Sequence, residues 1–379
     1  MYTKLLKKIV EDEKSGGIIL ILCTIVSLII ANSAFGEGYL HFWHFPLLGL
    51  NLELWINDGL MAIFFLLIGL ELKREVFIGE FSRPRNAILP VAAALGGMVV
   101  PVAFFLVFNL GLPTQSGLGI PMATDIAFAL GVLSLLGKRV PVSLKVFLMA
   151  LAVVDDLGAI LVIALFYTKD LMLLDLSIAL GIFAFLIVLN RLKVYSLIPY
   201  FIGGAVMWYF MLLSGVHATI SGVLLAMVIP FAGRTDGRSP SFVVMHKLHL
   251  PVTFLILPVF ALANTAVTIS SDWHTLFAEP ISLGILSGLL LGKPIGIGLA
   301  CLIVVWAKFS KLPAGVNWYN MIGVGLLGGI GFTMSIFITL LAFNDQQIID
   351  ISKIVILVSS LMAGILGYLC LHLTLKNSK

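Results

Sequence analysis

Charge is scarce in this sequence. Only 11% of its 379 residues are Asp, Glu, Lys or Arg, against roughly 25% in a typical soluble domain. Apolar residues make up 60% of the chain and the mean hydropathy is +1.12, more than a water-soluble fold can bury. This composition argues against a soluble enzyme and a disordered regulator. The net charge of +4 is too small and too scattered to indicate a nucleic-acid partner.

Cysteine is also rare. The three residues Cys23, Cys301 and Cys370 all lie inside apolar runs. An odd number without framework spacing argues against a disulfide scaffold.

Long apolar runs are abundant. A helix that crosses a bilayer needs about 20 mostly apolar residues, and such runs predict twelve spans in a single polytopic membrane domain of residues 1–379. The seventh and eighth are separated only by a short turn at Ser214, Gly215 and Val216. The predicted spans are 16–35, 58–79, 87–109, 117–136, 141–167, 171–190, 194–214, 216–232, 247–270, 281–307, 318–343 and 350–375.

The basic residues give the orientation. All but three of the 23 Lys and Arg fall on one side of the predicted spans, and the exceptions are Lys169, Lys293 and Lys353. The positive-inside rule then places both termini in the cytoplasm. The clustered residues are Lys4, Lys7, Lys8, Lys14, Lys73, Arg74, Arg83, Arg85, Lys138, Arg139, Lys145, Arg191, Lys193, Arg234, Arg238, Lys247, Lys308, Lys311, Lys376 and Lys379.

The one sizeable outer loop covers residues 36–57. Leucines alternate with other residues from Leu48 to Leu54, a period-2 pattern typical of a strand. The pattern is compatible with a short β-hairpin, whose exposed edge could pair with a second copy. It is equally compatible with an amphipathic loop that Trp43 and Trp55 anchor at the headgroups.

Four ionisable residues lie well inside the apolar spans: Asp125, Asp155, Asp156 and Lys293. Each costs at least a few kcal/mol near the bilayer centre, so such residues are functional candidates by default. A buried ion pair that fixes helix packing would explain Lys293 and one Asp. It would leave the other two carboxylates unexplained.

Asp155 and Asp156 are neighbours at the centre of the fifth span. Adjacent helix positions point about 100° apart, so one carboxylate can face a cavity while the other faces a neighbouring helix. Two carboxylates this close repel and lose hydration, which favours protonation of at least one. Carboxylate, hydroxyl and carbonyl oxygens also suit hard cations such as Na⁺ and Li⁺. A single site that can hold either a cation or protons, but not both, is the minimum that an exchanger requires.

Asp125 and Lys293 lie near helix-breaking residues. Gly117, Gly119 and Pro121 precede Asp125, and a glycine-rich stretch from Gly323 to Gly331 precedes Thr333 and Ser335. Two interrupted spans suggest inverted repeats, the third to fifth spans against the tenth to twelfth, with half-helix ends at mid-membrane. The negative charge of Asp125 would then compensate the partial positive charges of two helix N-terminal ends that face each other. The positive charge of Lys293 would compensate the partial negative charges of two C-terminal ends.

At these residues the sequence resembles the NhaA-type bacterial sodium/proton antiporter family, over essentially the whole chain. The matching segments are 57–65 (NDGLMAIFF), 69–75 (GLELKRE), 123–129 (ATDIAFA), 153–158 (VVDDLG), 214–219 (SGVHAT) and 292–294 (GKP).

The resemblance implies a twelve-helix fold whose fourth and eleventh helices are broken and cross near mid-membrane. Core repeats would cover about 87–167 and 281–375, and the remaining helices 16–79 and 171–270. It implies a pH-activated, electrogenic exchanger of the bacterial inner membrane that moves Na⁺ or Li⁺ against protons without a cofactor. It also implies a homodimer joined partly through the outer hairpin.

The resemblance also implies residue roles. Asp156 would be the main cation ligand, Asp155 the second carboxylate and the partner of Lys293, while Thr124 and Asp125 line the crossing. Residues for pH response or access would be His217, Asp58, Glu71, Arg74 and Glu75. Solvated or interfacial positions explain His217 and Asp58 as well, and Arg74 also fits a plain basic flank.

One departure concerns the start of the ninth helix. The family often has a glutamate where this chain has Met245, followed by His246 and His249. We therefore expect a different pH threshold and no loss of transport.

Three other functions fit the sequence less well. A sodium-coupled symporter would need a roomy polar site, and the spans have few Asn, Gln, Arg or Trp residues at mid-depth. An intramembrane aspartyl protease would need its two Asp on different helices, with Tyr-Asp and Gly-x-Gly-Asp motifs that this sequence lacks. A channel would not need paired titratable carboxylates beside a buried Lys.

Overall fold

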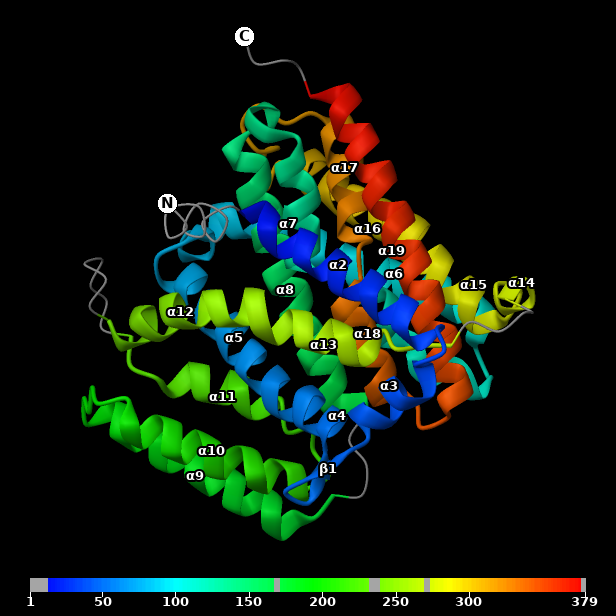
Figure 1. The fold of residues 1–379 in the computed structure, drawn as a ribbon. Helices are drawn as coiled ribbons and strands as arrows, with labels where there is room; N and C mark the ends of the chain where they lie inside the picture. The colour runs from blue at the N-terminus through cyan, green and yellow to red at the C-terminus, as the bar shows by residue number, and fades with distance from the viewer. Residues whose placement is uncertain (1–12, 167–170, 232–238, 269–272, 376–379) are drawn as a thin grey trace, which may run out of the picture. The chain divides into compact units, whose positions relative to one another are not determined.

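The computed structural model describes residues 13–166, 171–231, 239–268 and 273–375. These residues are predominantly helical, with one small sheet (Figure 1). Two compact units share the chain. The first contains the described parts of Met1–Tyr39, Arg83–Ala159 and Asn264–Lys379, and the second those of Leu40–Ser82 and Ile160–Ala263.

The first unit contains the segments with Asp125, Asp155, Asp156 and Lys293. Its elements are α2 (Glu13–Ala31), α6 (Pro84–Asn109), η3 (Pro113–Met122), α7 (Ile126–Leu135), η4 (Gly137–Arg139), most of α8 (Val142–Phe166), α14 (Trp273–Leu276), α15 (Pro280–Ser287), η6 (Gly288–Gly292), α16 (Lys293–Trp306), α17 (Trp318–Gly328), α18 (Phe332–Ala342) and α19 (Gln346–Thr374). The short helix α3 (Gly36–Trp43) joins the two units in sequence.

The second unit contains the outer hairpin and the remaining helices. Its elements are β1 (Pro46–Leu47), β2 (Leu50–Asn51), α4 (Leu52–Leu54), η1 (Trp55–Leu60), α5 (Met61–Phe77), η2 (Glu80–Ser82), α9 (Leu173–Arg191), α10 (Ile198–Leu213), α11 (Ile220–Val228), α12 (Pro240–Pro251), η5 (Val252–Ile256) and nearly all of α13 (Leu257–Asn264). Helices α9 and α10 lie side by side (Figure 1).

Length and apolar composition mark seven continuous helical stretches of the described residues as able to cross a membrane, or ten if three bent pairs each count as one span. Helix α10 has 16 residues and α11 only nine. The predicted total of twelve is therefore not established by the structure. The basic residues Lys4, Lys7, Lys8, Lys169, Arg234, Arg238, Lys376 and Lys379 lie outside the described residues.

Two of the bent pairs occur where the sequence predicted interruptions. The helical axis bends by 43° between η3 and α7, and by 45° between α17 and α18. Pro121 lies near the end of η3, and Gly329 and Gly331 lie between α17 and α18. Proline lacks a backbone N–H and glycine is a weak helix former, so both residues favour an interruption.

The outer loop forms the hairpin that one interpretation of the sequence predicted, but with strands of two residues each. Leu47 pairs with Leu50 and Pro46 with Asn51, and the turn uses positive φ angles at Leu48 and Gly49. The alternating pattern does not continue as a strand, because Asn51 accepts a hydrogen bond from Leu54 N and begins a helical turn.

Close packing of α6 against α16 depends on glycine. A Cβ at Gly96 would collide with the Gly296 carbonyl oxygen, and a Cβ at Gly296 would collide with that of Gly96. A Cβ at Gly97 would come within 3.7 Å of Lys293 Cδ. The two backbones therefore touch at the point where Lys293 begins α16.

Substituting Gly296 by Ala should force α6 and α16 apart. The added methyl group would meet the Gly96 backbone, and overpacking of this kind typically costs about 1–3 kcal/mol. Gly298→Ala is the matched control on the same helix, because a Cβ at Gly298 would have no atom within 4 Å beyond its own stretch of helix backbone. We expect thermal unfolding in detergent to show a lower Tm for Gly296→Ala and an unchanged or slightly higher Tm for Gly298→Ala. Equal Tm values would contradict this account of the helix crossing.

Candidate functional site

Thr124 and Asp125 lie in the break between η3 and α7. Both are buried, with exposed fractions of 0% and 2%. The Asp125 backbone N–H donates to the Ile330 carbonyl at 2.7 Å, and Ile330 lies in the break between α17 and α18. The two breaks are thus hydrogen-bonded to each other through the backbone.

Asp125 accepts hydrogen bonds from the N-terminal ends of two helices. Its Oδ1 accepts from Phe128 N of α7 at 2.9 Å. Its Oδ2 accepts from both the backbone N–H and the hydroxyl of Thr333 in α18. A carboxylate satisfies the free N–H groups of a helix start and is favoured by the positive end of the helix dipole. Asp125 therefore stabilises both half-helix starts at once.

Asp155 and Lys293 form a buried ion pair. Lys293 Nζ lies 2.6 Å from Asp155 Oδ2, and both side chains are completely buried. Thr124 Oγ1 lies 2.8 Å from the same Oδ2 and accepts a hydrogen bond from Lys293 Nζ at 2.9 Å. Asp155 Oδ1 has no hydrogen-bond partner among the described residues. The contacts of this carboxylate with the ammonium and the hydroxyl are therefore all made by one of its two oxygens.

The Thr124 hydroxyl connects this pair to the helix break. It has one hydrogen but faces two acceptors, Asp155 Oδ2 and the Gly328 carbonyl, which lies 2.9 Å away at the end of α17. The hydroxyl can donate to only one acceptor at a time. A change in the charge on Asp155 can therefore change the hydrogen bonding at the end of α17.

Asp156 follows Asp155 on α8 and is 1% exposed. Within the described residues, no group of three or more His, Cys, Asp or Glu side chains could hold a metal ion. A hard cation bound by Asp155 and Asp156 would therefore need further oxygen ligands that are not carboxylates. Hydroxyl, carbonyl and water oxygens are such ligands, and Thr124 supplies a hydroxyl beside Asp155.

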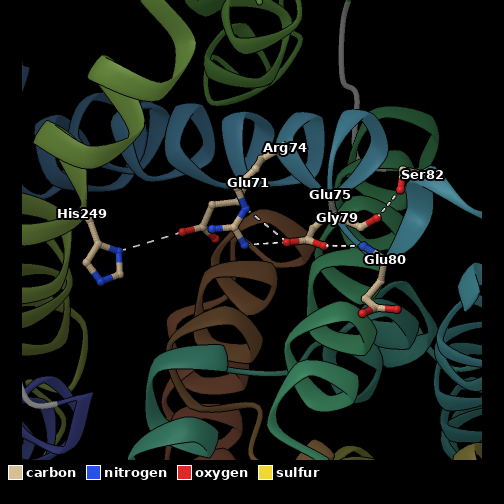
Figure 2. A network of polar contacts seen from close by, with 7 residues as sticks. All are labelled: Glu71, Arg74, Glu75, Gly79, Glu80, Ser82 and His249. Atoms are coloured by element: carbon tan, nitrogen blue, oxygen red, sulfur yellow. Dashed lines mark hydrogen bonds and ion pairs between the residues drawn. The ribbon is translucent and has the colours of Figure 1, made fainter. Parts of the chain in front are cut away.

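A second polar group lies along α5 in the other unit, and Figure 2 shows it from close by. Glu71 Oε1 lies 3.9 Å from His249 Nδ1 of α12. Arg74 donates two hydrogen bonds to Glu75 Oε1, and Glu75 Oε2 accepts from Glu80 N at 3.1 Å. The structure thus gathers Glu71, Arg74 and Glu75 on one helix beside a titratable histidine.

The two remaining sequence candidates lie in the same unit. Asp58 is in η1, and its backbone carbonyl accepts a hydrogen bond from Trp208 Nε1 at 3.0 Å. His217 lies between α10 and α11 and is partly exposed.

Comparison with known proteins identifies the family. The model of the family described as Na⁺/H⁺ antiporter 1 matches residues 7–371. This chain belongs to that family. Together with the apolar helices, membership makes it a multi-pass membrane protein.

Several curated proteins are similar over nearly their whole length. A protein of Flavobacterium psychrophilum named Na(+)/H(+) antiporter NhaA is 62% identical over 376 residues, which cover 99% of this chain and 98% of the relative. Na(+)/H(+) antiporter NhaA 1 of Flavobacterium johnsoniae is 57% identical, with coverage of 100% and 99%. Na(+)/H(+) antiporter NhaA of Dechloromonas aromatica is 56% identical, with coverage of 97% and 95%.

In this member of the Na⁺/H⁺ antiporter 1 family, the sequence indicated the buried charges and Thr124, but not the other hydroxyls that bond at the helix breaks. Thr333 was noted only as part of a helix interruption, yet it donates twice to Asp125. Ser360 of α19 is a second such hydroxyl, and its Oγ accepts a hydrogen bond from Phe332 N at the start of α18. A serine or threonine in an apolar helix does not by itself indicate a partner on another helix, because its hydroxyl can bond to a backbone carbonyl of its own helix.

Replacing Asp125 by Ala should destabilise the protein strongly. It removes acceptors from two buried helix starts, at about 1–3 kcal/mol for each donor left unsatisfied. Asp345→Ala is the matched control, because Asp345 caps only α19, through an exposed hydrogen bond to Gln347 N. Loss of a single cap typically costs about 1 kcal/mol. Thermal unfolding in detergent should therefore show a larger fall in Tm for Asp125→Ala. Equal falls would show that Asp125 does not hold the two breaks together.

Proposed function

We propose that this protein exchanges cytoplasmic Na⁺ or Li⁺ for external protons, through competition between the cation and protons for Asp155 and Asp156. The printed names of its relatives, Na(+)/H(+) antiporter, support the reaction class. The observation that carries the mechanism is the buried Asp155 carboxylate, which has one oxygen bound by Lys293 and Thr124 and the other without a hydrogen-bond partner among the described residues.

The cation enters as a substrate and finds oxygen ligands already in place. Asp156 is the main ligand, with Asp155 and Thr124 completing the set. An arriving Na⁺ competes with the Lys293 ammonium for the negative charge of Asp155. Protonation of the two carboxylates removes that charge and releases the cation. Protons and Na⁺ therefore never occupy the site together.

The exchange requires no cofactor and is electrogenic. Two carboxylates and one lysine can take up more positive charge as protons than a single Na⁺ brings. The cycle then moves more protons than sodium ions, and the membrane potential contributes to its driving force.

In the proposed fold, twelve spans include η3–α7 as the fourth and α17–α18 as the eleventh, both discontinuous. These two cross near mid-membrane and belong to inverted repeats. The bends of 43° and 45° and the hydrogen bonds of Asp125 to both breaks support this arrangement. Asp125 would stabilise the crossing without coordinating the cation. Half-helix ends of this kind lie beside the ion sites of inverted-repeat transporters, a class of which NhaA is itself a known example.

Activation at rising pH is assigned to the polar group on α5 and to access residues. Glu71 lies 3.9 Å from His249, and Arg74 forms an ion pair with Glu75 one turn along the same helix (Figure 2). We place this group at the cytoplasmic mouth, and Asp58 and His217 at positions that affect access or pH response.

We further propose a homodimer in the bacterial inner membrane, with both termini in the cytoplasm. The hairpin of β1 and β2 supports the dimer, because its two short strands form a two-stranded sheet with outer edges that could pair with a second copy.

Asp156→Asn should abolish sodium-driven proton movement. A neutral amide cannot exchange a cation for protons, so the variant should fail throughout pH about 6 to 9, the range in which buried carboxylates titrate. The measurement is lumen alkalinisation in acidified everted vesicles on addition of Na⁺. Asp345→Asn, at an exposed position, is the control and should behave as the parent protein.

In the parent protein, exchange should also fall at acid pH, since protonated carboxylates do not bind Na⁺. Robust exchange by Asp156→Asn at any pH in this range would refute the site assignment.

A further inference from the structure

Lys73, one of the basic residues that indicate the orientation of the spans, has a buried side chain. The structure places it within α5, between Glu71 and Arg74, with an exposed fraction of 7%. A lysine that only marked the cytoplasmic side would extend its ammonium to the headgroups. Lys73 instead turns its ammonium into the protein.

The Lys73 ammonium meets the C-terminal end of α11. Nζ lies 3.2 Å from the Ala226 carbonyl oxygen, 2.8 Å from that of Met227 and 2.6 Å from that of Ile229. Three acceptors at these distances match the three N–H donors of an ammonium. These carbonyls belong to the negative end of the helix dipole, where a cation is favoured.

Other side chains complete this carbonyl site. Asn190 of α9 donates to the Val228 carbonyl at 2.7 Å. Ser241 of α12 donates its backbone N–H to the Pro230 carbonyl at 3.2 Å. Its hydroxyl lies within hydrogen-bond distance of the Ile229 and Pro230 carbonyls and can donate to one of them at a time. Five successive carbonyl oxygens, those of residues 226–230, thus receive donors from three other helices. Only one of those donors, the Lys73 ammonium, is a cation.

We propose that the end of α11 is a site built from backbone carbonyls for a cation with N–H donors, and that the Lys73 ammonium fills it from within the chain. The ammonium acts as a covalently attached cation that caps the C-terminal end of α11. It also prevents these carbonyls from binding a free cation. The proposal concerns Lys73 itself and does not depend on the exchange mechanism.

The tether also fixes α11 against α5. The two helices pack closely at Gly69, whose Cβ would lie 2.6 Å from Ala226 Cβ, and at Gly222, whose Cβ would collide with the Ala62 carbonyl. Glycine at these positions allows the close approach of the two helices. The bonds from Lys73 to three carbonyls at the end of α11 set one position along the axis.

The test is chemical rescue of Lys73→Ala, read as Tm in detergent. The truncation leaves the carbonyls without their cation and opens space beside them. We expect a fall in Tm of roughly 5 °C or more. Methylammonium chloride should restore part of it, whereas equimolar tetramethylammonium chloride, which has no N–H donor, should not. Lys138→Ala, at an exposed position, is the control and should show neither the fall nor the selective rescue.

A parent-like Tm for Lys73→Ala, or equal effects of the two salts, would overturn the proposal. If Lys73→Ala cannot be recovered in either salt, two longer side chains decide. Lys73→Arg keeps a cation with N–H donors and should melt above Lys73→Met, which fills the space without charge. A Met variant that melts at or above the Arg variant would also overturn the proposal. Because none of these measurements uses transport, a failure here is distinct from a failure of the exchange mechanism.

Discussion

The contact between the Lys293 ammonium and the Asp155 carboxylate is the interaction on which the rest of the structure depends. Both groups are fully buried, and removing such charges from water costs several kcal/mol for each ion unless hydrogen bonds and the opposite charge offset it. The Thr124 hydroxyl bonds to both partners and offsets part of this cost. Among the described residues, one Asp155 oxygen has no protein donor. That combination suits a group that must accept a different partner during a cycle.

The surrounding helices are interrupted and closely packed in ways that serve this contact. Breaking a helix inside a membrane exposes backbone groups that must find partners within the protein. Asp125 supplies acceptors for two helix starts, and Thr124 faces the last carbonyl of α17. The contact of Gly96 with Gly296 brings the start of α16, and so Lys293, against α6. At these two breaks, the loss of helical regularity is compensated by polar contacts of Asp125 and Thr124, beside the ion pair.

Much of this was predictable because charge is conspicuous in an apolar sequence. Asp125, Asp155, Asp156 and Lys293 stood out as charges inside long apolar runs, and Pro121 with the glycines near Gly331 indicated the two places where the helical axis bends by 43° and 45°. Composition could not give the pairing of Lys293 with Asp155, which came from the family resemblance. It also could not give the length of α11 or of the strands. The hydrogen bond from Leu54 N to Asn51, for example, begins a helical turn and ends the strand, although the alternation of leucines continues to Leu54 in the sequence. The role of Lys73 was not predictable, because a charge count cannot separate a lysine that reaches the headgroups from one that bonds to a helix end.

The proposed mechanism requires that Na⁺ and protons compete for the same carboxylates, and proton release on Na⁺ binding tests this competition most directly. Purified protein in weakly buffered detergent solution would be titrated with NaCl while a pH indicator or calorimeter records protons released. If cation and protons share Asp155 and Asp156, Na⁺ binding must expel protons, and the number released per Na⁺ must fall as the starting pH rises and the carboxylates become ionised. Saturable Na⁺ binding without proton release at any pH would contradict the account.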